Sequence, residues 1–392
     1  MKALTWQGRR DVRVETVPDP TVQADTDVII EVTSSGLCGS DLHLYETLGA
    51  FLHAGDVLGH EPMGVVVEKG SGVPNLDVGD RVVVPFQIAC GHCFMCGDGL
   101  PTQCETTQVR EHGMGAALFG YTDLYGSVPG GQAELLRVPH ADFGPVKVNP
   151  DASDDRYLFV SDVLPTAWQA VEYSGVQSDQ TLVILGLGPI GEMAARVALQ
   201  RGVRVIGVDL VRFRLDRADA LGVETLDLEH DDVVARVLDA TSGRGADAVI
   251  DAVGMEAHGS PGAEMAQRLA TMLPKRVAQA VMLNAGVDRM AAINMAVELV
   301  RRGGTISLSG VYAGALDPMP LQVIFDKQLT LRMGQANVRR WVDDFLPLVE
   351  DSSDPLGLDT FATHHVALDA APEAYAMFQR KDPGVQKVVF KP

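Results

Sequence analysis

The chain has 392 residues, enough for two domains with separate hydrophobic cores. Its formal net charge is −20 and 46% of its residues are hydrophobic, a balance typical of a globular protein. So acidic a chain repels phosphate backbones, and we expect no nucleic-acid partner. No apolar run approaches the length of a membrane span, and the N-terminal residues have no apolar signal core. We therefore expect a cytoplasmic protein with no membrane partner.

The first third of the chain is rich in valine and punctuated by glycine. Short apolar segments at residues 28–33, 64–68 and 81–85 are typical of strands, and Gly79-Asp80 is a turn signal before the last of them. This pattern predicts a partly closed β domain.

A cysteine and a histidine stand in glycine-rich turns of this first third. Cys38 lies in the segment Gly-Leu-Cys-Gly-Ser-Asp, and His60 lies in Gly-His-Glu-Pro. A thiolate and an imidazole are half of an open zinc site, which needs one more protein ligand and keeps its fourth position for water or substrate. A single cysteine is more often a packing residue, but the glycine turn around the histidine favours the metal site.

Four of the five cysteines follow in one short segment, Cys90, Cys93, Cys96 and Cys104. Two gaps of two residues and one of seven allow four thiolates to reach a single tetrahedral ion. A ferredoxin-type iron–sulfur segment would have a shorter last gap and a proline after it, whereas here Glu105 follows. Four protein ligands leave zinc no open position, so this site is predicted to be structural.

The pattern changes near residue 164, where helical stretches begin to alternate with buried apolar strands. Strands are expected at residues 181–185, 204–209, 246–253 and 304–309. Such alternation predicts an α/β fold with a doubly wound parallel sheet. The tail at residues 386–390 is strand-like again, and we expect it to return to the first domain.

A complete G-x-G-x-x-G segment follows the strand at 181–185. Gly186 allows a tight turn, Gly188 lets the backbone approach a pyrophosphate, and Gly191 lets helix and strand pack closely. The segment, which includes Pro189 and Ile190, opens a helical stretch at residues 192–200, and the N–H groups at the helix N-terminus would face the phosphates. The segment predicts a dinucleotide site.

The carboxylate of Asp209 stands at the end of the next strand, eighteen positions after the last glycine of the segment. It is placed to accept hydrogen bonds from the adenosine ribose and to repel a 2′-phosphate, which favours NAD over NADP. Arg212 and Arg214 lie close by, and they would either flank the adenine or tolerate the extra phosphate.

This order of features resembles the zinc-containing medium-chain alcohol dehydrogenases. The segment 59–64, with Gly70 and Val73, is similar to that family's zinc pattern. Residues 130–134, 139–143 and 161–166 resemble its formaldehyde dehydrogenase-like branch. The resemblance implies a GroES-like partly closed β-barrel catalytic domain over 1–165, completed by 336–392. It implies a Rossmann NAD-binding domain over 166–335.

The resemblance also supplies the rest of the catalytic site. It makes Asp162 the third ligand of the catalytic zinc. It lets Glu61 approach the metal from behind, although this side chain would equally be a nearby charge that never binds the ion. It passes the proton from Ser40 through the nicotinamide ribose to His43.

Further cofactor contacts follow from the same resemblance. Thr166 matches a threonine behind the nicotinamide ring. Gly310, Val311 and Tyr312 match the segment whose backbone holds the carboxamide. Lys387 matches a basic residue that reaches the pyrophosphate. Each of these would otherwise be an ordinary strand or helix residue.

The chain departs from the family in a long helical insertion, expected at residues 255–301. Segments 263–273 and 291–300 have helical spacing of their apolar residues. One hypothesis makes the insertion a cover over the adenosine end of the cofactor. The alternative is simple packing onto the sheet.

The sequence thus predicts a homodimeric or homotetrameric enzyme with NAD and two zinc ions per chain. It would transfer a hydride between NAD and a small alcohol, or an aldehyde hydrate or adduct. A polyol or amino-alcohol (threonine-type) dehydrogenase on the same scaffold is an alternative, and so is a catalytically idle NAD-binding regulatory protein. Tyr45, Phe51 and Trp168 are candidates for an apolar substrate wall, although core packing explains each equally well.

Overall fold

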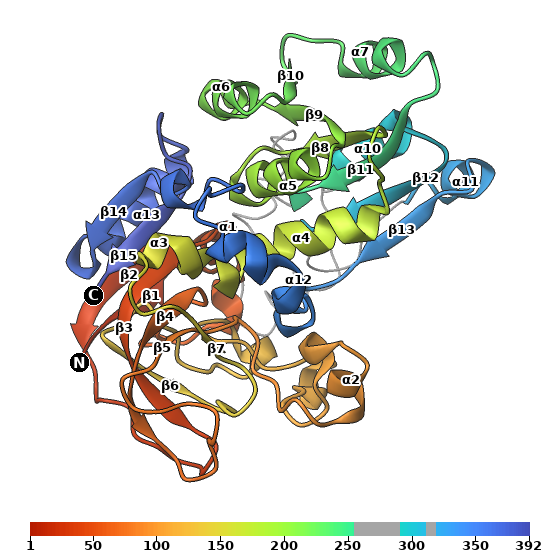
Figure 1. Cartoon of the computed structure of the whole chain (residues 1–392). Coiled ribbons are helices and arrows are strands. Elements are labelled where there is room, and N and C mark those ends of the chain that lie inside the picture. Colours follow the sequence, from red (N-terminus) through yellow and green to blue (C-terminus); the bar gives the residue numbers. More distant parts are fainter. Residues whose placement is uncertain (255–290, 311–318) are drawn as a thin grey trace. The chain divides into compact units, whose positions relative to one another are not determined.

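The computed structural model describes residues 1–254, 291–310 and 319–392 (Figure 1). The chain divides into two compact units, one made of Met1–Pro165 with Ala336–Pro392 and the other of Thr166–Gln335. None of the helices in the described ranges is long and apolar enough to cross a membrane. The first unit therefore uses both ends of the sequence, and the second uses its middle.

A seven-stranded sheet is the framework of the first unit. Its central strand β3 (Val28–Leu37) pairs antiparallel with β4 (Pro62–Lys69), with β6 and with β15. The remaining strands are β5 (Arg81–Val83), β6 (Leu135–Val138), β7 (Val146–Lys147), β14 (His364–Ala367) and β15 (Val388–Lys391). Strand β15 brings the C-terminal segment to this sheet, as its apolar sequence predicts.

The core of this unit follows from strand alternation. Val28, Ile30 and Val32 of β3 are buried in one cluster with Val66 and Val82, because every second side chain of a strand lies on the same face. The expected β domain is confirmed. The strands predicted at 28–33 and 64–68 lie within β3 and β4, and β5 covers residues 81–83 of the strand predicted at 81–85. A separate hairpin of β1 (Lys2–Gly8) and β2 (Asp11–Thr16) was not predicted.

Helix α1 (Gly39–Glu46) begins directly after β3, with Cys38 as its N-cap residue. The Asp41 carboxylate accepts a hydrogen bond of 2.9 Å from the Cys38 backbone N–H. A carboxylate in the first turn also suits the positive end of the helix dipole. This cap fixes the cysteine at the junction of strand and helix.

The other helices connect or cover the sheet of this unit. They are α2 (Phe94–Gly97), α3 (Asp154–Tyr157), α12 (Val338–Glu350) and α13 (Ala371–Arg380). Short 3-10 turns are η1 (Leu48–Phe51), η2 (Pro101–Gln103), η3 (Arg110–His112), η4 (Asp123–Tyr125), η5 (Leu158–Ser161), η7 (Leu358–Thr360) and η8 (Leu368–Ala370). Helix α4 (Val163–Ser174) starts in the first unit and continues into the second.

The second unit contains a six-stranded parallel sheet in the order β10-β9-β8-β11-β12-β13. Its strands are β8 (Thr181–Leu185), β9 (Arg204–Asp209), β10 (Glu224–Asp227), β11 (Ala246–Asp251), β12 (Val300–Leu308) and β13 (Thr330–Met333). Its other helices are α5 (Pro189–Gln200), α6 (Arg212–Ala220), α7 (Val233–Ala240), α10 (Ala291–Leu299) and α11 (Leu321–Asp326). The predicted doubly wound sheet is confirmed.

The strand order reverses between β8 and β11. The chain runs outward from β8 through β9 to β10 and then returns to place β11 on the other side of β8. In open parallel sheets, ligands bind outside the carboxyl ends of the strands at such a reversal. The glycine segment at residues 186–191 follows the carboxyl end of β8, where a dinucleotide is expected.

The expected insertion over 255–301 is only partly described, since residues 255–290 lie outside the described ranges and segment 263–273 lies with them. The described end of the insertion is α10, whose Ile293, Ala296 and Val297 are buried in the core of the sheet. Apolar residues at this spacing share one helix face. Helix α10, which lies between β11 and β12 in the sequence, therefore packs on the sheet, in line with the packing alternative for this part of the insertion.

A half-buried carboxylate joins the C-terminal strand to the rest of the first unit. Asp154 on α3 contacts Ser34 and Arg81, and Lys391 donates to it at 3.0 Å. Burial alone would raise the pKa of Asp154, but the hydrogen bonds from these three side chains lower it to about 2. The ordinary pKa of an aspartate is near 3.8, so the pKa of Asp154 is lower in the folded chain than in the unfolded one. Ionised Asp154 therefore stabilises the folded chain.

We expect Asp154→Asn to lower the free energy of unfolding by ~1–2 kcal/mol at pH 7. Because the folded pKa lies below the unfolded one, this contribution is fully present above pH ~4 and is lost as the pH falls from about 4 to about 2. Urea unfolding at pH 7 and at pH 3 measures it. Asp369→Asn, which breaks an exposed pair with Lys2, is the matched control and should change little. If the difference in free energy of unfolding between wild type and Asp154→Asn were as large at pH 3 as at pH 7, this role would be contradicted.

Candidate active site and metal centres

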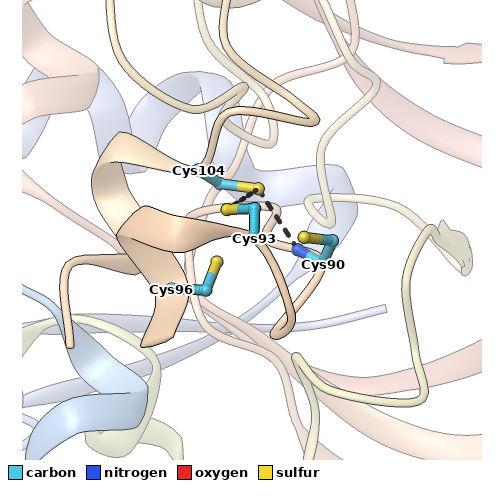
Figure 2. A group of neighbouring side chains, drawn as sticks. All are labelled: Cys90, Cys93, Cys96 and Cys104. Atoms are coloured by element: carbon cyan, nitrogen blue, oxygen red, sulfur yellow. Dashed lines mark hydrogen bonds between the residues drawn. The ribbon is translucent and has the colours of Figure 1, made fainter. Parts of the chain in front are cut away.

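The four clustered cysteines surround one point in the first unit (Figure 2). Their sulfur atoms all lie within 4.8 Å of one another, and none of these cysteines is in a disulfide. Burial would raise the pKa of the Cys104 thiol, but hydrogen bonds from Thr107 and from the backbone lower it to about 6. A closed set of four sulfur donors fits a tetrahedral structural zinc.

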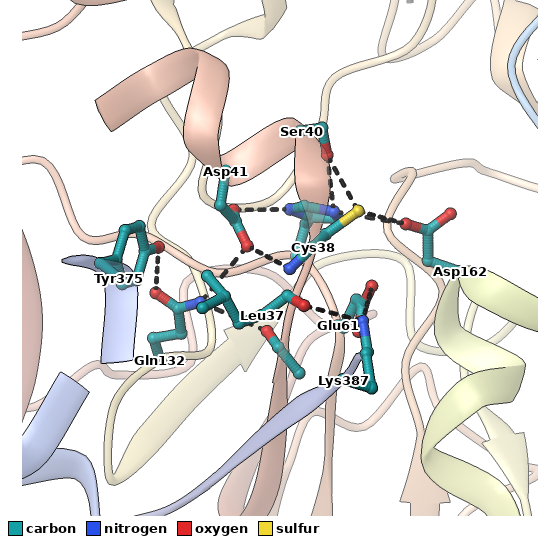
Figure 3. Close-up of polar contacts among 11 residues, drawn as sticks. Leu37, Cys38, Ser40, Asp41, Glu61, Gln132, Asp162, Tyr375 and Lys387 are labelled. Carbon is teal, nitrogen blue, oxygen red and sulfur yellow. Dashed lines mark hydrogen bonds and ion pairs between the residues drawn. The ribbon is translucent and has the colours of Figure 1, made fainter. Parts of the chain in front are cut away.

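A second cluster joins Cys38, His60 and Asp162, three residues far apart in the sequence (Figure 3). Cys38 Sγ lies 3.4 Å from Asp162 Oδ2, and His60 Nε2 lies 3.4 Å from the same oxygen. Zinc bonds of about 2.0–2.3 Å place tetrahedral ligand atoms about 3.3–3.8 Å apart, so the spacing fits one ion.

The charge balance of this cluster also fits a cation. The three side chains are only 5–8% exposed. Burial, with the Asp162 carboxylate beside it, raises the pKa of the Cys38 thiol to about 11. A divalent ion reverses this balance, because a coordinated thiol is deprotonated.

Local chain geometry places each of the three ligands. Cys38 caps α1, His60 lies in the turn before β4, and Asp162 ends the 3-10 turn η5 just before α4. Asp41 Oδ1 lies 3.1 Å from His60 Nδ1, so Nε2 is the ring nitrogen that faces the other ligands. A carboxylate partner of this kind orients a metal-binding histidine.

Ser40 and His43 follow Cys38 on α1. The Ser40 hydroxyl lies 3.3 Å from Cys38 Sγ and 3.2 Å from His60 Nε2, beside the position of an ion. His43 is one turn further along the helix and is 8% exposed, so it is a buried residue and not a surface histidine.

The structure corrects the expectation for Lys387. Its ammonium lies 2.5 and 2.7 Å from the two Glu61 oxygens and donates to the Leu37 carbonyl at 3.0 Å. Both side chains of this pair are fully buried. The amine is therefore engaged within the first unit and is not available to a pyrophosphate.

The buried pair depends on a close approach. A Cβ at Gly36 would lie 1.8 Å from Glu61 Oε2, so a side chain there would displace the carboxylate. The carboxylate belongs to the same group of potential ligands as Cys38. A lysine beside the apolar strand β15 is the sequence signal for such a pair, because a buried ammonium needs an acidic partner.

In the second unit, the glycine segment has the geometry of a phosphate-binding turn. Gly186 has φ +86°, and a Cβ at Gly191 would lie 1.8 Å from the Gly186 carbonyl oxygen. Gly188 caps α5 and Pro189 is its first residue, with Ile190 next in the first turn. The helix N-terminus is thus open to an anion, and the residues fit a dinucleotide.

Asp209 is held by the same turn. Its Oδ2 accepts the Leu187 N–H at 2.6 Å, and its Oδ1 accepts the Leu210 and Val211 N–H groups at 2.7 and 2.8 Å. Arg214 Nη1 lies 3.8 Å from Oδ2. The carboxylate is therefore fixed at the end of β9.

The two arginines near Asp209 differ in position. The Arg214 guanidinium lies 3.6 Å from where a Cβ of Gly188 would be, so it belongs to the glycine turn. The side chain of Arg212 is 76% exposed and pairs with Asp216 at 2.6 Å. Of the two, only Arg214 lies beside the cofactor turn.

The remaining cofactor candidates are less informative. Thr166 lies in the first turns of α4. The Gly310 N–H donates to the Asp251 carbonyl at 2.9 Å, so it joins the segment after β12 to the end of β11. Val311 and Tyr312 lie outside the described residues.

The aromatic wall of the metal site was missed from the sequence. The rings of Phe86 and Tyr121 approach His60 edge-on, each with its centroid 6.4 Å from the imidazole. Tyr45 instead packs against Tyr375, and Phe51 is a buried core residue. Phe86 and Tyr121 come from separate loops, so no periodic signal marks them.

The third aromatic candidate, Trp168, lies on α4 in the second unit, where the Arg201 guanidinium stacks over its ring at 4.1 Å. This contact gives the indole a packing role on that unit.

Two protein families match separate parts of the chain. Residues 24–148 match the alcohol dehydrogenase GroES-like domain, and residues 189–272 match the zinc-binding dehydrogenase family. The two matches fall on the β-sheet unit that holds both cysteine-containing clusters and on the parallel sheet with its glycine turn. The fold and its sites therefore define a zinc-binding dehydrogenase.

Individual relatives extend over the whole chain. The zinc-type alcohol dehydrogenase-like protein AdhB of Bacillus subtilis (strain 168) is 38% identical and aligns over 100% of both chains. The formaldehyde dismutase of Pseudomonas putida is 33% identical over 97% of this chain and 96% of its own. The solved alcohol dehydrogenase TADH from Thermus sp. ATN1 has a TM-score of 0.82 at 32% identity, covering 100% of this chain and 99% of its own. The chain belongs to the zinc-containing medium-chain alcohol dehydrogenase family, as predicted.

Membership in this family confirms the predicted class of activity, which is zinc-dependent oxidation and reduction of alcohols and aldehydes. The idle regulatory protein and the polyol or amino-alcohol dehydrogenase, the two alternatives from the sequence, are not favoured.

Proposed function

We propose that this protein is an NAD-dependent dehydrogenase of a small alcohol or aldehyde hydrate, with Cys38, His60 and Asp162 as the ligands of its catalytic zinc. The observation that carries the proposal is the meeting of sulfur, nitrogen and oxygen donors at 3.4 Å in a buried cluster. Three protein ligands leave one position for a substrate. A bound zinc would lower the pKa of the substrate hydroxyl, and a bound NAD would accept the hydride.

The chain's own residues handle the proton. The Ser40 hydroxyl is close enough to both Cys38 and His60 to hydrogen-bond a substrate oxygen beside them. His43 lies three residues further along α1, on the same side of the helix, and imidazole is a common proton carrier in enzymes. We propose that the Ser40 hydroxyl accepts the substrate's proton as it gives up its own, and that His43 is the residue that receives the released proton.

The surroundings of the metal cluster favour a small or apolar substrate. Phe86 and Tyr121 place two aromatic edges against His60. Such walls offer few hydrogen-bond partners for the extra hydroxyls of a polyol. Since the relative in Pseudomonas putida is a formaldehyde dismutase, we include hydrated formaldehyde among the proposed substrates.

We expect Ser40→Ala to lower kcat by ~10²–10⁴-fold, as loss of a proton-transfer group does, while the protein keeps two zinc ions per chain. NADH absorbance, with primary alcohols, polyols, formaldehyde and its glutathione adduct as substrates, gives the rate, and elemental analysis gives the zinc. Ser35→Ala is the matched control, because this buried hydroxyl has no hydrogen-bond partner in the described residues. Full turnover by the Ser40 variant would refute the relay, and one zinc per wild-type chain would favour an idle scaffold.

We propose NAD as the cofactor because the Asp209 carboxylate, fixed by three backbone N–H groups, would repel a 2′-phosphate. Wild type should therefore show a larger kcat/KM with NAD than with NADP. Asp209→Asn should lower the ratio of kcat/KM with NAD to kcat/KM with NADP about 10-fold or more, because the variant loses hydrogen bonds to a charged group.

Steady-state kinetics with both cofactors measures that ratio. Damage to the turn itself would lower kcat/KM with NAD and with NADP together, so a change in their ratio reports on the ribose contact alone. Asp227→Asn is the control, since Asp227 ends the neighbouring strand β10 in register with Asp209. A preference for NADP in wild type would refute the assignment.

We also propose a homodimer or homotetramer in a reducing cytoplasm, where all five cysteines remain thiols. Strand β13 is an edge of the parallel sheet, and Leu321, Phe325 and Met333 nearby are 60–85% exposed. Apolar side chains along a sheet edge are suited to a twofold contact with a second copy.

We expect Phe325→Asp combined with Met333→Asp to reduce the mass in solution to that of one chain, measured by light scattering after gel filtration. Phe94→Asp, which changes another exposed phenylalanine on α2, is the control and should keep the wild-type mass. A wild-type monomer, or an unaltered assembly in the double variant, would overturn this surface.

A further inference from the structure

A line of polar contacts runs from the C-terminal helix α13 to the candidate zinc ligand His60. Figure 3 labels its first three members, Tyr375, Gln132 and Asp41. It begins at Tyr375, which is fully buried. The Tyr375 hydroxyl donates a hydrogen bond of 2.8 Å to Gln132 Oε1. The two residues are far apart in the sequence, and neither belongs to the predicted site.

This hydrogen bond decides which way the Gln132 amide points. Because Oε1 accepts the tyrosine proton, the NH₂ group must face the opposite side. There it approaches the Gly36 carbonyl at 3.3 Å and Asp41 Oδ2 at 3.5 Å. The amide thus presents a donor to the carboxylate.

The Asp41 carboxylate carries this orientation to the histidine. Its Oδ2 is held by the Cys38 N–H at 2.9 Å and by the glutamine. Its Oδ1 forms an ion-pair contact of 3.1 Å with His60 Nδ1, and neither of these two buried atoms has a hydrogen-bond partner in the described residues. The Asp41 carboxylate is therefore the polar group against Nδ1, and its position bears directly on that of the imidazole.

The backbone keeps Gln132 against the histidine turn. The Gln132 N–H donates to the Leu58 carbonyl at 3.0 Å, and a Cβ at Gly59 would lie 2.4 Å from Gln132 Cγ. Gly59 has φ +98°, which favours glycine as well. The side chain is thus packed directly beside the residue that precedes His60.

We propose that Gln132 and Tyr375 are positioning residues for the catalytic zinc, acting on His60 through Asp41. The inference rests on the proposed function, because it takes Cys38, His60 and Asp162 as the zinc ligands. Partners behind the ligands of a metal site typically contribute 10–100-fold to its affinity. In this chain, such partners reach back to the C-terminal helix.

A purely structural role for Tyr375 is the competing explanation. Its ring packs on Tyr45 at 5.5 Å and stacks on Phe390 at 6.4 Å. Tyr375→Phe keeps these ring contacts and removes one oxygen. The variant therefore separates the hydrogen bond from the packing.

The rate of zinc release from each variant is measured with a chromogenic chelator. Wild type should release its two zinc ions in two kinetic phases. The phase that is absent in His60→Ala is assigned to the catalytic site, and the other to the four cysteines. We expect Tyr375→Phe to accelerate this phase about 10-fold or more while the four-cysteine phase is unchanged. Tyr157→Phe is the control, since this buried tyrosine interacts with the backbone of Asn149 and not with the metal cluster. It should leave both phases as in wild type.

Gln132→Met, alone and combined with Tyr375→Phe, shows whether the tyrosine acts on the metal site only through the glutamine. The double variant should release zinc no faster than Gln132→Met alone, because the tyrosine acts only through the glutamine. If Gln132→Met does not fold, Tyr375→Phe with its control decides the question.

Three results would overturn the inference. They are release from Tyr375→Phe at the wild-type rate, equal acceleration by Tyr157→Phe, and multiplication of the two effects in the double variant. A wild-type protein without a second zinc would refute the proposed function itself, a failure that is distinct because it appears before any variant is made.

Discussion

The candidate metal site depends on the contacts of one buried group, the Asp41 carboxylate. One oxygen caps α1 by holding the Cys38 N–H, and the other faces His60. A single buried carboxylate thus connects the strand–helix junction that carries the thiol with the turn that carries the imidazole. Three ligands from separate segments can hold one ion only where their approach is fixed by such contacts, because zinc bonds tolerate little variation in length.

Burial gives the same region its electrostatic character. Glu61 and Lys387 form a fully buried ion pair beside the cluster, in space that Gly36 leaves free. A buried charge without a partner is strongly destabilising, so the C-terminal strand that carries the lysine is part of the site's framework. Lys391 of the same strand reaches Asp154. The last residues of the chain therefore complete the catalytic unit instead of forming a free tail.

The nucleotide unit uses backbone geometry where the catalytic unit uses side-chain charge. The turn after β8 exposes the N-terminus of α5, and three N–H groups fix Asp209 at the end of the next strand. This arrangement needs only glycines at fixed spacing and one acidic residue, all local to a single strand–helix–strand segment. The metal cluster in contrast draws its ligands from residues 38, 60 and 162.

That difference separates what the sequence determined from what the tertiary structure decided. Spacing alone identified the four-cysteine segment, the glycine turn and several strands of each unit, because short-range geometry fixes them. The resemblance, and not spacing, selected Asp162. Only the fold showed that Lys387 faces Glu61, that Phe86 and Tyr121 border His60, and that Gln132 and Tyr375 stand behind Asp41. These contacts join residues up to 326 positions apart, and their formation depends on how the segments pack.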